Sequence, residues 1–220
     1  MQTISLQTLQ HMWPNAPHQL VVDFCAMSPE IFAKYGLNTD RRLKHFMGQI
    51  STETSGGSLP GMRESMNYSH AERIVEVFGA PHSSAGVTMQ EAVGLVHNAK
   101  ALAMRVYGPT RSPHLAHMLG NIKDEDGWDF RGGGLLQNTG RAMYDHLSKL
   151  TGIDLIGSPD LINDTKTNIA CAVIEFCQPA TLQAADNDNV QAVSKCVNGG
   201  TNGLHDRIVW TANWGKALGA

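Results

Sequence analysis

The chain has 220 residues, of which 42% are hydrophobic, and a formal net charge of -3 at pH 7. This length and composition suit one globular domain with a sizeable core, and the charge argues against the strongly cationic surface of a nucleic-acid-binding protein. No stretch approaches about 18 apolar residues, so we expect no membrane-spanning helix. The N-terminus lacks the basic and apolar regions of a signal peptide, so we expect synthesis without an export signal.

Capping residues and glycines predict a series of helices, so the expected fold class is mainly α. The expected helices run from Ser28 to Gly36, from Thr39 or Asp40 to Gly56, from Ser69 to Gly79, from Thr88 to Gly108, from Ser158 as a short helix, from Thr165 toward Cys177, from Asn187 to Gly199 and from about Leu204 to Ala217. Two of them begin with the spacing of a capping box, Ser69 with Glu72 and Thr88 with Glu91. Alternating patterns are scarce, and residues 134–137 are the best short strand candidate.

The four cysteines and ten histidines are expected to be structural. Cys25, Cys171, Cys177 and Cys196 form no C-x-x-C pair, and buried thiols in helices are the simplest interpretation. The histidines are scattered, without H-E-x-x-H or paired-Cys spacing. We therefore expect no metal site.

The stretch from Leu43 to Ser69 carries the strongest indication of a functional site. Leu43, Phe46, Met47 and Ile50 form one apolar stripe on a helix, and Glu53 continues to the edge of that stripe near the helix end. Burial and the negative end of the helix dipole both favour the protonated carboxyl there. Such a group suits general-acid catalysis.

A second acid, Glu64, follows in a short loop before Asn67 and Tyr68. A buried helix-end acid facing a loop acid across a cleft suits inverting glycoside hydrolysis, which needs a water between carboxyls about 6.5–9.5 Å apart. Spacing alone favours the plainer alternative of an exposed helix-terminal Glu53 and a solvated Glu64.

Asp124 to Tyr144 combines a tryptophan, an arginine, three successive glycines and two polar residues. Trp128 offers an apolar face for a sugar ring, Gln137 and Thr139 can hold hydroxyls or a water, and glycines allow close backbone approach. A phosphate-binding loop is the alternative, but the glycines lack G-x-G-x-x-G spacing.

The C-terminal motif VNGGTNGLHDR places Asn198, Asn202 and Arg207 beside glycines. A planar guanidinium suits the bridging of carboxylates. Alternatively, Arg207 ties the last helix to the body of the protein, and both roles are compatible.

These motifs resemble, in order, those of family 19 of the glycoside hydrolases. FMGQISTETSGG is similar to the catalytic helix of the family 19 chitinases and related phage endolysins, and RESMNYSHAERIVEVF to the segment that follows in short members. EDGWDFRGGGLLQNTGRAMY and VNGGTNGLHDR extend the match over most of residues 40–210. The resemblance implies a lysozyme-like, two-lobed helical domain with a substrate cleft and little β structure.

The resemblance also implies roles for individual residues. Glu53 is the expected general acid and Glu64 the expected base, with Thr139 orienting the attacking water. The expected substrate-binding residues are Asn67, Tyr68, Trp128, Arg131, Gln137, Asn198 and Arg207, of which Arg207 lies near the acid. No metal or organic cofactor is needed for this single displacement.

Four positions depart from the family pattern. Thr52 replaces a common His, Gly133 replaces the second Arg of RGRG, Asn138 replaces an apolar residue, and Met143 stands where Asn often contacts substrate. None removes a proposed acid or base. They do make a transfer of chitin specificity unsafe.

The expected function is that of a monomeric, endolysin-like peptidoglycan hydrolase. Residues 1–220 leave no room for a separate wall-binding module, so the catalytic domain itself would bind the glycan. The protein would be made in a host cytoplasm and act in the periplasm or cell wall, after holin-assisted release if phage-encoded. The alternatives are a chitinase, the same chemistry in a secreted antibacterial effector, and a non-catalytic glycan-binding protein.

Overall fold

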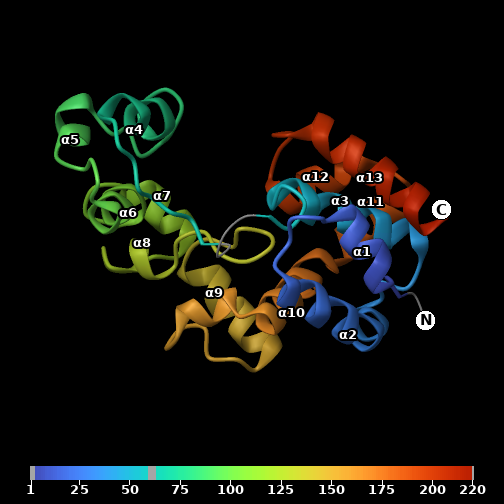
Figure 1. The fold of residues 1–220 in the computed structure, drawn as a ribbon. Helices are drawn as coiled ribbons and strands as arrows, with labels where there is room; N and C mark the ends of the chain where they lie inside the picture. Colours follow the sequence, from blue (N-terminus) through green and yellow to red (C-terminus); the bar gives the residue numbers. More distant parts are fainter. Residues whose placement is uncertain (1–2, 59–62, 220) are drawn as a thin grey trace. The chain divides into compact units, whose positions relative to one another are not determined.

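The computed structural model describes residues 3–58 and 63–219 (Figure 1). The chain is mainly helical, and the β structure within these ranges consists of isolated bridges that join Arg63 to Gly133 and Gly133 to Asn138. The mainly α fold class is therefore confirmed. Two compact units divide the chain, and neither is continuous in sequence. In the described ranges, no helix is both long and apolar enough to cross a membrane.

Unit 1 comprises Met1–Met62, Gly134–Leu136 and Leu161–Ala220. Its α-helices are α1 (Leu6–Met12), α2 (His18–Tyr35), α3 (Asp40–Glu53), α10 (Thr165–Phe176), α11 (Pro179–Asp186), α12 (Val190–Asn198) and α13 (Leu204–Leu218). Helix α3 packs along α13 and α2 along α10, although each pair is far apart in the sequence (Figure 1). An aromatic group that includes Phe24, Phe46 and Phe176 lies at the centre of the core.

Helix α3 is held closely at the centre of unit 1. Thr39 caps it by accepting a hydrogen bond from the Arg42 amide. Gly48 allows α13 to approach, since a Cβ there would lie 2.2 Å from Thr211 Oγ1. Ser51 Oγ accepts hydrogen bonds from the indoles of Trp13 at 2.8 Å and Trp214 at 2.9 Å. These contacts fix the helix that ends at Glu53.

Unit 2 comprises Arg63–Gly133 and Gln137–Asp160. Its α-helices are α4 (Ala71–Phe78), α5 (Met89–Val93), α6 (Ala99–Tyr107), α7 (Pro113–Leu119), α8 (Asp126–Asp129) and α9 (Arg141–Thr151). A smaller apolar core includes Ile74, Phe78, Leu102 and Val106. The 3₁₀ helix η2 (Pro159–Asn163) lies where the chain returns to unit 1.

The expected helix start at Ser28 is wrong. Helix α2 begins at His18 and contains Pro29, while Gly36 ends it in the left-handed conformation as expected. Proline has no N–H for the carbonyl four residues earlier. The Ser28 hydroxyl donates to that carbonyl, Cys25 O, at 3.4 Å, and so provides a substitute donor.

The expected starts of two further helices, α4 and α12, also differ from the structure. The Ser69–Glu72 capping box is absent, because His70 is the N-cap of α4 and makes no side-chain capping bond. Ser69 Oγ instead lies 2.9 Å from His70 Nδ1. Asn189 rather than Asn187 caps α12.

The Thr88–Glu91 capping box is confirmed, but its helix ends at Val93. A second helix, α6, begins after Asn98 and ends at Gly108, so one expected helix is two. The short helix after Ser158 is the 3₁₀ helix η2, and α10, α13 and the end of α12 at Gly199 agree with expectation.

Residues 134–137 are a turn rather than the expected strand. Gly134 and Gln137 have φ values of 77° and 52°, which no strand adopts. The turn connects Gly133 and Asn138, which form a bridge. Leu135 and Leu136 are buried in the core of unit 1, and the Leu135 amide donates to Asn168 Oδ1.

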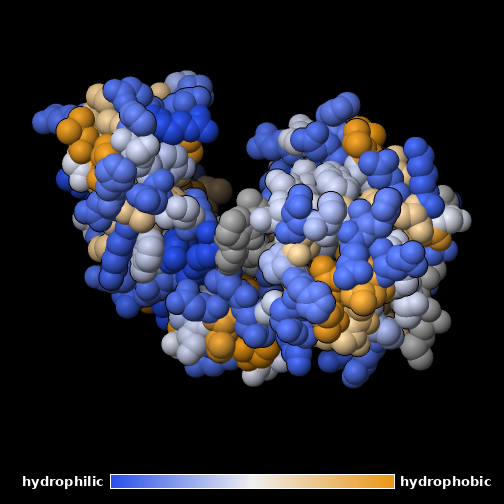
Figure 2. Space-filling model, in the orientation of Figure 1, coloured by the Kyte–Doolittle hydropathy of each residue, from blue (hydrophilic) through white to orange (hydrophobic). Residues whose placement is uncertain are grey.

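The visible surface is mostly hydrophilic, with small separate groups of hydrophobic residues (Figure 2). The described large apolar side chains that are exposed lie on several elements, for example Val93 in α5 and Ile208 in α13. All four cysteines are free thiols; Cys171 is buried, but Cys196 is exposed, contrary to expectation.

Candidate active site

The Glu53 cluster, formed by Glu53, Gln49 and Arg207, lies in unit 1. Glu53 is the last residue of α3, and its side chain is 21% exposed. Its Oε1 accepts a hydrogen bond from Arg207, which is 2% exposed and also donates to Gln49 Oε1. Glu53 is therefore partly buried, and its partner is a buried guanidinium. The structure does bring Arg207 and Glu53 together.

Local hydrogen bonds end α3 directly after Glu53. The Thr54 hydroxyl donates to Ile50 O at 2.6 Å and accepts from the Gly57 amide at 2.8 Å. Gly57 has a φ of 73°, in the left-handed region that glycine adopts readily. Thr52, which replaces the usual histidine, donates to Gly48 O of its own helix at 2.9 Å.

The Glu64 cluster lies in unit 2 and includes Glu64, Tyr107 and Gly132. Glu64 Oε1 accepts from the Tyr107 hydroxyl at 2.9 Å, and Oε2 from the Gly132 amide at 3.2 Å. Burial raises the pKa of Glu64, while these two donors and the nearby arginines oppose that rise. Glu64 is thus partly buried and hydrogen-bonded, unlike the solvated acid of the plainer alternative.

Gly132 lets the side chains of Glu64 and Gln137 approach the same point of the backbone. A Cβ at Gly132 would lie 3.0 Å from Gln137 Oε1 and 3.4 Å from Glu64 Oε2. Gln137 has a φ of 52°, which is uncommon outside glycine and costs free energy. Thr139 Oγ1 donates to Gln137 O at 2.9 Å. The structure therefore brings Gln137 beside Glu64 and ties Thr139 to the same turn.

Arg131 supports the backbone of the Glu64 cluster. Its guanidinium carbon lies 3.5 Å from the centre of the Trp128 ring, a close cation–π contact. Arg131 Nε donates to Glu64 O at 3.0 Å, and Nη1 donates to Trp128 O at 2.7 Å. Because Arg131 covers one face of Trp128, only the other face could stack on a sugar ring.

Arg63 is a residue that the sequence reasoning missed. It precedes Glu64 and donates to Arg131 O at 3.3 Å, to Asp129 O at 2.6 Å and to the Tyr144 hydroxyl. Its guanidinium thus fixes the backbone of residues 129–131, which precede the three glycines. Tyr107 was also missed, because no local spacing connects the end of α6 with Glu64.

The remaining expected substrate-binding residues are Asn67, Tyr68 and Asn198. Tyr68 packs edge-on against Phe78, with ring centres 5.7 Å apart. Asn67 and Asn198 are exposed. In the described part of the chain, Asn67 makes no side-chain hydrogen bond to Glu64 and Asn198 makes none to Glu53.

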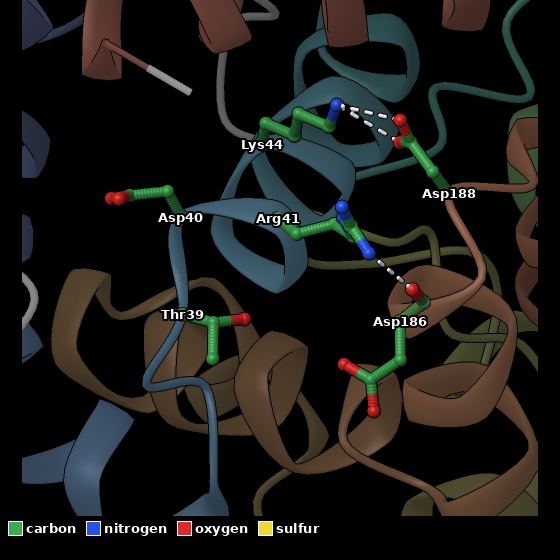
Figure 3. A pocket seen from close by; sticks show the side chains of 6 residues that line it. All are labelled: Thr39, Asp40, Arg41, Lys44, Asp186 and Asp188. Carbon is green, nitrogen blue, oxygen red and sulfur yellow. Dashed lines mark hydrogen bonds and ion pairs between the residues drawn. The ribbon is translucent and has the colours of Figure 1, made fainter.

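A pocket of about 800 Å³ lies at the other end of α3, lined by Thr39, Asp40, Arg41, Lys44, Asp186 and Asp188 (Figure 3). Its cations already have partners: Lys44 Nζ lies 2.9 Å from Asp188 Oδ1, and Arg41 donates to Asp186 O at 2.8 Å. These contacts join α3 to Asp186 at the end of α11 and to Asp188 shortly after it. Across residues 3–58 and 63–219, no group of three or more His, Cys, Asp or Glu could hold a metal ion.

Comparisons with known proteins support the resemblance in both sequence and fold. No family model matches the chain. A "glycosyl hydrolase family 19 domain-containing protein" of Haemophilus influenzae is 28% identical over 196 residues, which cover 87% of this chain and 86% of that protein.

Solved structures of chitinases share the fold. A chitinase C mutant aligns with a TM-score of 0.63 and 14% identity, over 99% of this chain and 77% of its own. A bacterial family 19 chitinase aligns with a TM-score of 0.59 and 14% identity, over 99% of this chain and 95% of its own. By sequence and by fold, the chain is similar to glycoside hydrolases of family 19.

Proposed function

We propose that the protein hydrolyses β-1,4 glycosidic bonds of a polymer that contains N-acetylhexosamine, with inversion at the anomeric carbon. Glu64 is the general base. The observation that carries this role is that both its carboxyl oxygens accept hydrogen bonds, from Tyr107 and from Gly132. An ionised carboxylate accepts at both oxygens, and burial makes it a stronger base.

In this proposal, Glu64 removes a proton from water, and Thr139 and Gln137 help to hold the water and the sugar. The water oxygen attacks the anomeric carbon from the face opposite to the leaving group. Gln137 lies next to Glu64 at Gly132, and Thr139 is bonded to Gln137 O, which supports a joint role.

Glu53 is the proposed general acid. One of its carboxyl oxygens is bound by Arg207, while Oε2 has no hydrogen-bond partner among the described residues. That oxygen can carry the proton that Glu53 delivers to the leaving glycosidic oxygen. Arg207, anchored by Gln49, holds the carboxyl in one orientation.

Bacterial peptidoglycan is the substrate we favour. The short segment between Glu53 and Asn67 resembles the compact endolysin branch, and the departures at Thr52, Gly133 and Met143 argue against a simple transfer of chitin specificity. Such an enzyme would act as a monomer on the wall, after holin-assisted release if phage-encoded. Chitin is the second candidate, because the solved structures that share the fold are chitinases.

The substrate is tested with two assays on the same preparation. We expect outer-membrane-permeabilised bacteria to lose turbidity, and Glu53→Gln and Glu64→Gln to abolish this loss. Cleavage of soluble chitin oligomers without lysis would favour the chitinase. Binding of either glycan without cleavage by the unaltered protein would overturn the catalytic proposal.

The roles of the two glutamates are tested with leaving groups of different acidity. A nitrophenyl leaving group needs little protonation, so Glu53→Gln should lose much less activity on a nitrophenyl oligosaccharide than on the natural glycan. Glu64→Gln should lose activity on both. The reverse pattern would exchange the two roles, and a product that forms first as the β-anomer would exclude inversion.

A further inference from the structure

Tyr107 forms a hydrogen bond that connects α6 with the proposed base. Its hydroxyl donates to Glu64 Oε1 at 2.9 Å, over a separation of 43 residues. Among the described residues, this is the side-chain hydrogen bond that the carboxylate receives, and the Gly132 amide supplies the backbone one. The ring of Tyr107 is half-buried at the end of α6.

The backbone of Tyr107 is itself anchored. Its carbonyl accepts a hydrogen bond from Asn121 Nδ2 at 3.0 Å, and Asn121 Oδ1 accepts from the Arg141 amide at 2.9 Å. Asn121 is 6% exposed, so these bonds are shielded from water. The phenol therefore projects from a fixed backbone position, so the hydrogen bond to Glu64 forms with little loss of conformational entropy.

The phenol remains a neutral donor. Burial raises the pKa of Tyr107, and the neighbouring Glu64 raises it further. A tyrosine that cannot ionise beside a carboxylate can only donate its proton in that hydrogen bond. The hydrogen bond from Tyr107 thus stabilises the ionised form of Glu64 relative to the protonated form.

The other groups that face Glu64 act without a side-chain hydrogen bond to it. Arg63 and Arg131 favour its negative charge from a distance, while their own hydrogen bonds go to backbone carbonyls and to Tyr144. Glu64 raises the pKa of the half-buried Tyr68, which marks the two groups as electrostatic neighbours.

We propose that Tyr107 is a positioning residue for Glu64, whose hydroxyl orients the carboxylate and keeps it ionised toward lower pH. The inference rests on the proposed role of Glu64 as general base. If the hydroxyl is removed, the carboxylate keeps one fixed donor, the Gly132 amide, and can rotate about it. Its ionised form also becomes less favourable, because burial is then less well opposed.

The test is Tyr107→Phe, which keeps the ring and removes the hydroxyl. The titration of Glu64 is followed by ¹³C NMR of the side-chain carboxyl, assigned by its loss in Glu64→Gln. We expect the midpoint to rise by about one pH unit, as loss of a charge-assisted hydrogen bond implies. The acidic limb of the pH–rate profile should move up by the same amount, with a lower kcat and little change in KM.

Tyr35→Phe is the matched control, because Tyr35 lies in unit 1 and contacts Lys34 rather than Glu64. It should leave both the titration and the rate profile unchanged. Tyr107→Gln supplies a different donor and should give an intermediate midpoint, which also provides a second variant if Tyr107→Phe folds poorly.

An unchanged Glu64 midpoint in folded Tyr107→Phe would overturn the inference. A raised Glu64 midpoint with an unchanged pH–rate profile would also overturn it, because Tyr107 would then not affect catalysis through Glu64. Failure of the proposed function is distinguishable, since it would be seen as full activity of Glu64→Gln in the unaltered Tyr107 background.

Discussion

Arg207 reaches Glu53 from a buried position, while the glutamate itself keeps contact with solvent. The arginine is 2% exposed and the glutamate side chain 21%. The same guanidinium donates to Gln49 Oε1 and, through Nε at 3.1 Å, to Asn202 O. One rigid planar group therefore joins the end of α3 to the start of α13.

Arg207→Lys should damage both activity and stability. A lysine keeps the charge but cannot serve Glu53, Gln49 and the Asn202 carbonyl together. We expect kcat to fall about 10- to 100-fold and the free energy of unfolding to fall by about 1–3 kcal/mol. Urea unfolding and initial rates measure the two effects. Arg73→Lys is the control, because Arg73 pairs with Glu76 on the surface and should change neither quantity.

Ser51→Ala should destabilise unit 1 strongly. The hydroxyl is buried and accepts from two indole N–H groups, of Trp13 and Trp214. Its removal leaves two buried donors without an acceptor, at a cost of about 2–5 kcal/mol. Thermal unfolding followed by tryptophan fluorescence measures the loss. Ser69→Ala, at an exposed site, should stay within about 0.5 kcal/mol of the unaltered protein, and an equally small effect of Ser51→Ala would contradict this account.

Asn138→Leu should stabilise the protein. Asn138 is 3% exposed, and neither polar atom of its side-chain amide has a hydrogen-bond partner among the described residues. An apolar side chain of similar size removes that penalty, so we expect a gain of about 1 kcal/mol in the free energy of unfolding. Family 19 proteins also carry an apolar residue at this position, by the resemblance described above.

Asn121→Leu is the matched control for that substitution. Asn121 is also buried, but both ends of its amide are bonded, to Tyr107 O and to the Arg141 amide. It should lose about 1–3 kcal/mol in the same urea experiment. Equal losses in the two variants would show that Asn138 has partners in solution.

Glu91 should make stability depend on pH in the acid range. Its hydrogen bonds from Arg105 and from the Thr88 amide and hydroxyl lower its pKa from 4.5 to about 2. Because the pKa is lower in the folded state, the carboxylate stabilises the fold fully above about pH 4.5, and that contribution disappears as pH falls toward about 2.

The measurement is urea unfolding of the unaltered protein and of Glu91→Gln across that pH range. At pH 7 the variant should be less stable by about 1–3 kcal/mol, discounted because the side chain is 27% exposed. The difference should shrink toward zero near pH 2. Glu76→Gln, which removes an exposed partner of Arg73, should show no comparable trend.

Local signals predicted helices well where residues within one or two turns determine the structure. The period of Leu43, Phe46 and Ile50 placed α3, and Gly36 ended α2, because both depend on neighbours within one or two turns. The expected helix start at Ser28 was wrong, because the preference of proline for the first turn of a helix takes no account of a nearby hydroxyl donor. The Ser28 hydroxyl supplies the donor that proline lacks.

The environments of the two glutamates could not be read from their neighbours in the chain. Glu53 receives its arginine from 154 residues away, and Glu64 its tyrosine from 43 residues away. Desolvation depends on such distant partners, so local spacing did not predict the partial burial of Glu64 or its hydrogen bond from Tyr107. The identity of the acids came from the motif, and their surroundings only from the fold.

The tripeptide Gly134–Leu136 has a consequence for how the enzyme would fail. These three residues belong to unit 1, whereas Gly133 before them and Gln137 after them belong to unit 2. Within the tripeptide, Leu135 is buried in the core of unit 1. A Leu135→Ala substitution would create a cavity in the core of unit 1 and would thus loosen the turn at residues 134–137 without altering the Gln137 side chain. Inactivation by heat and exposure of that turn to proteases should consequently coincide.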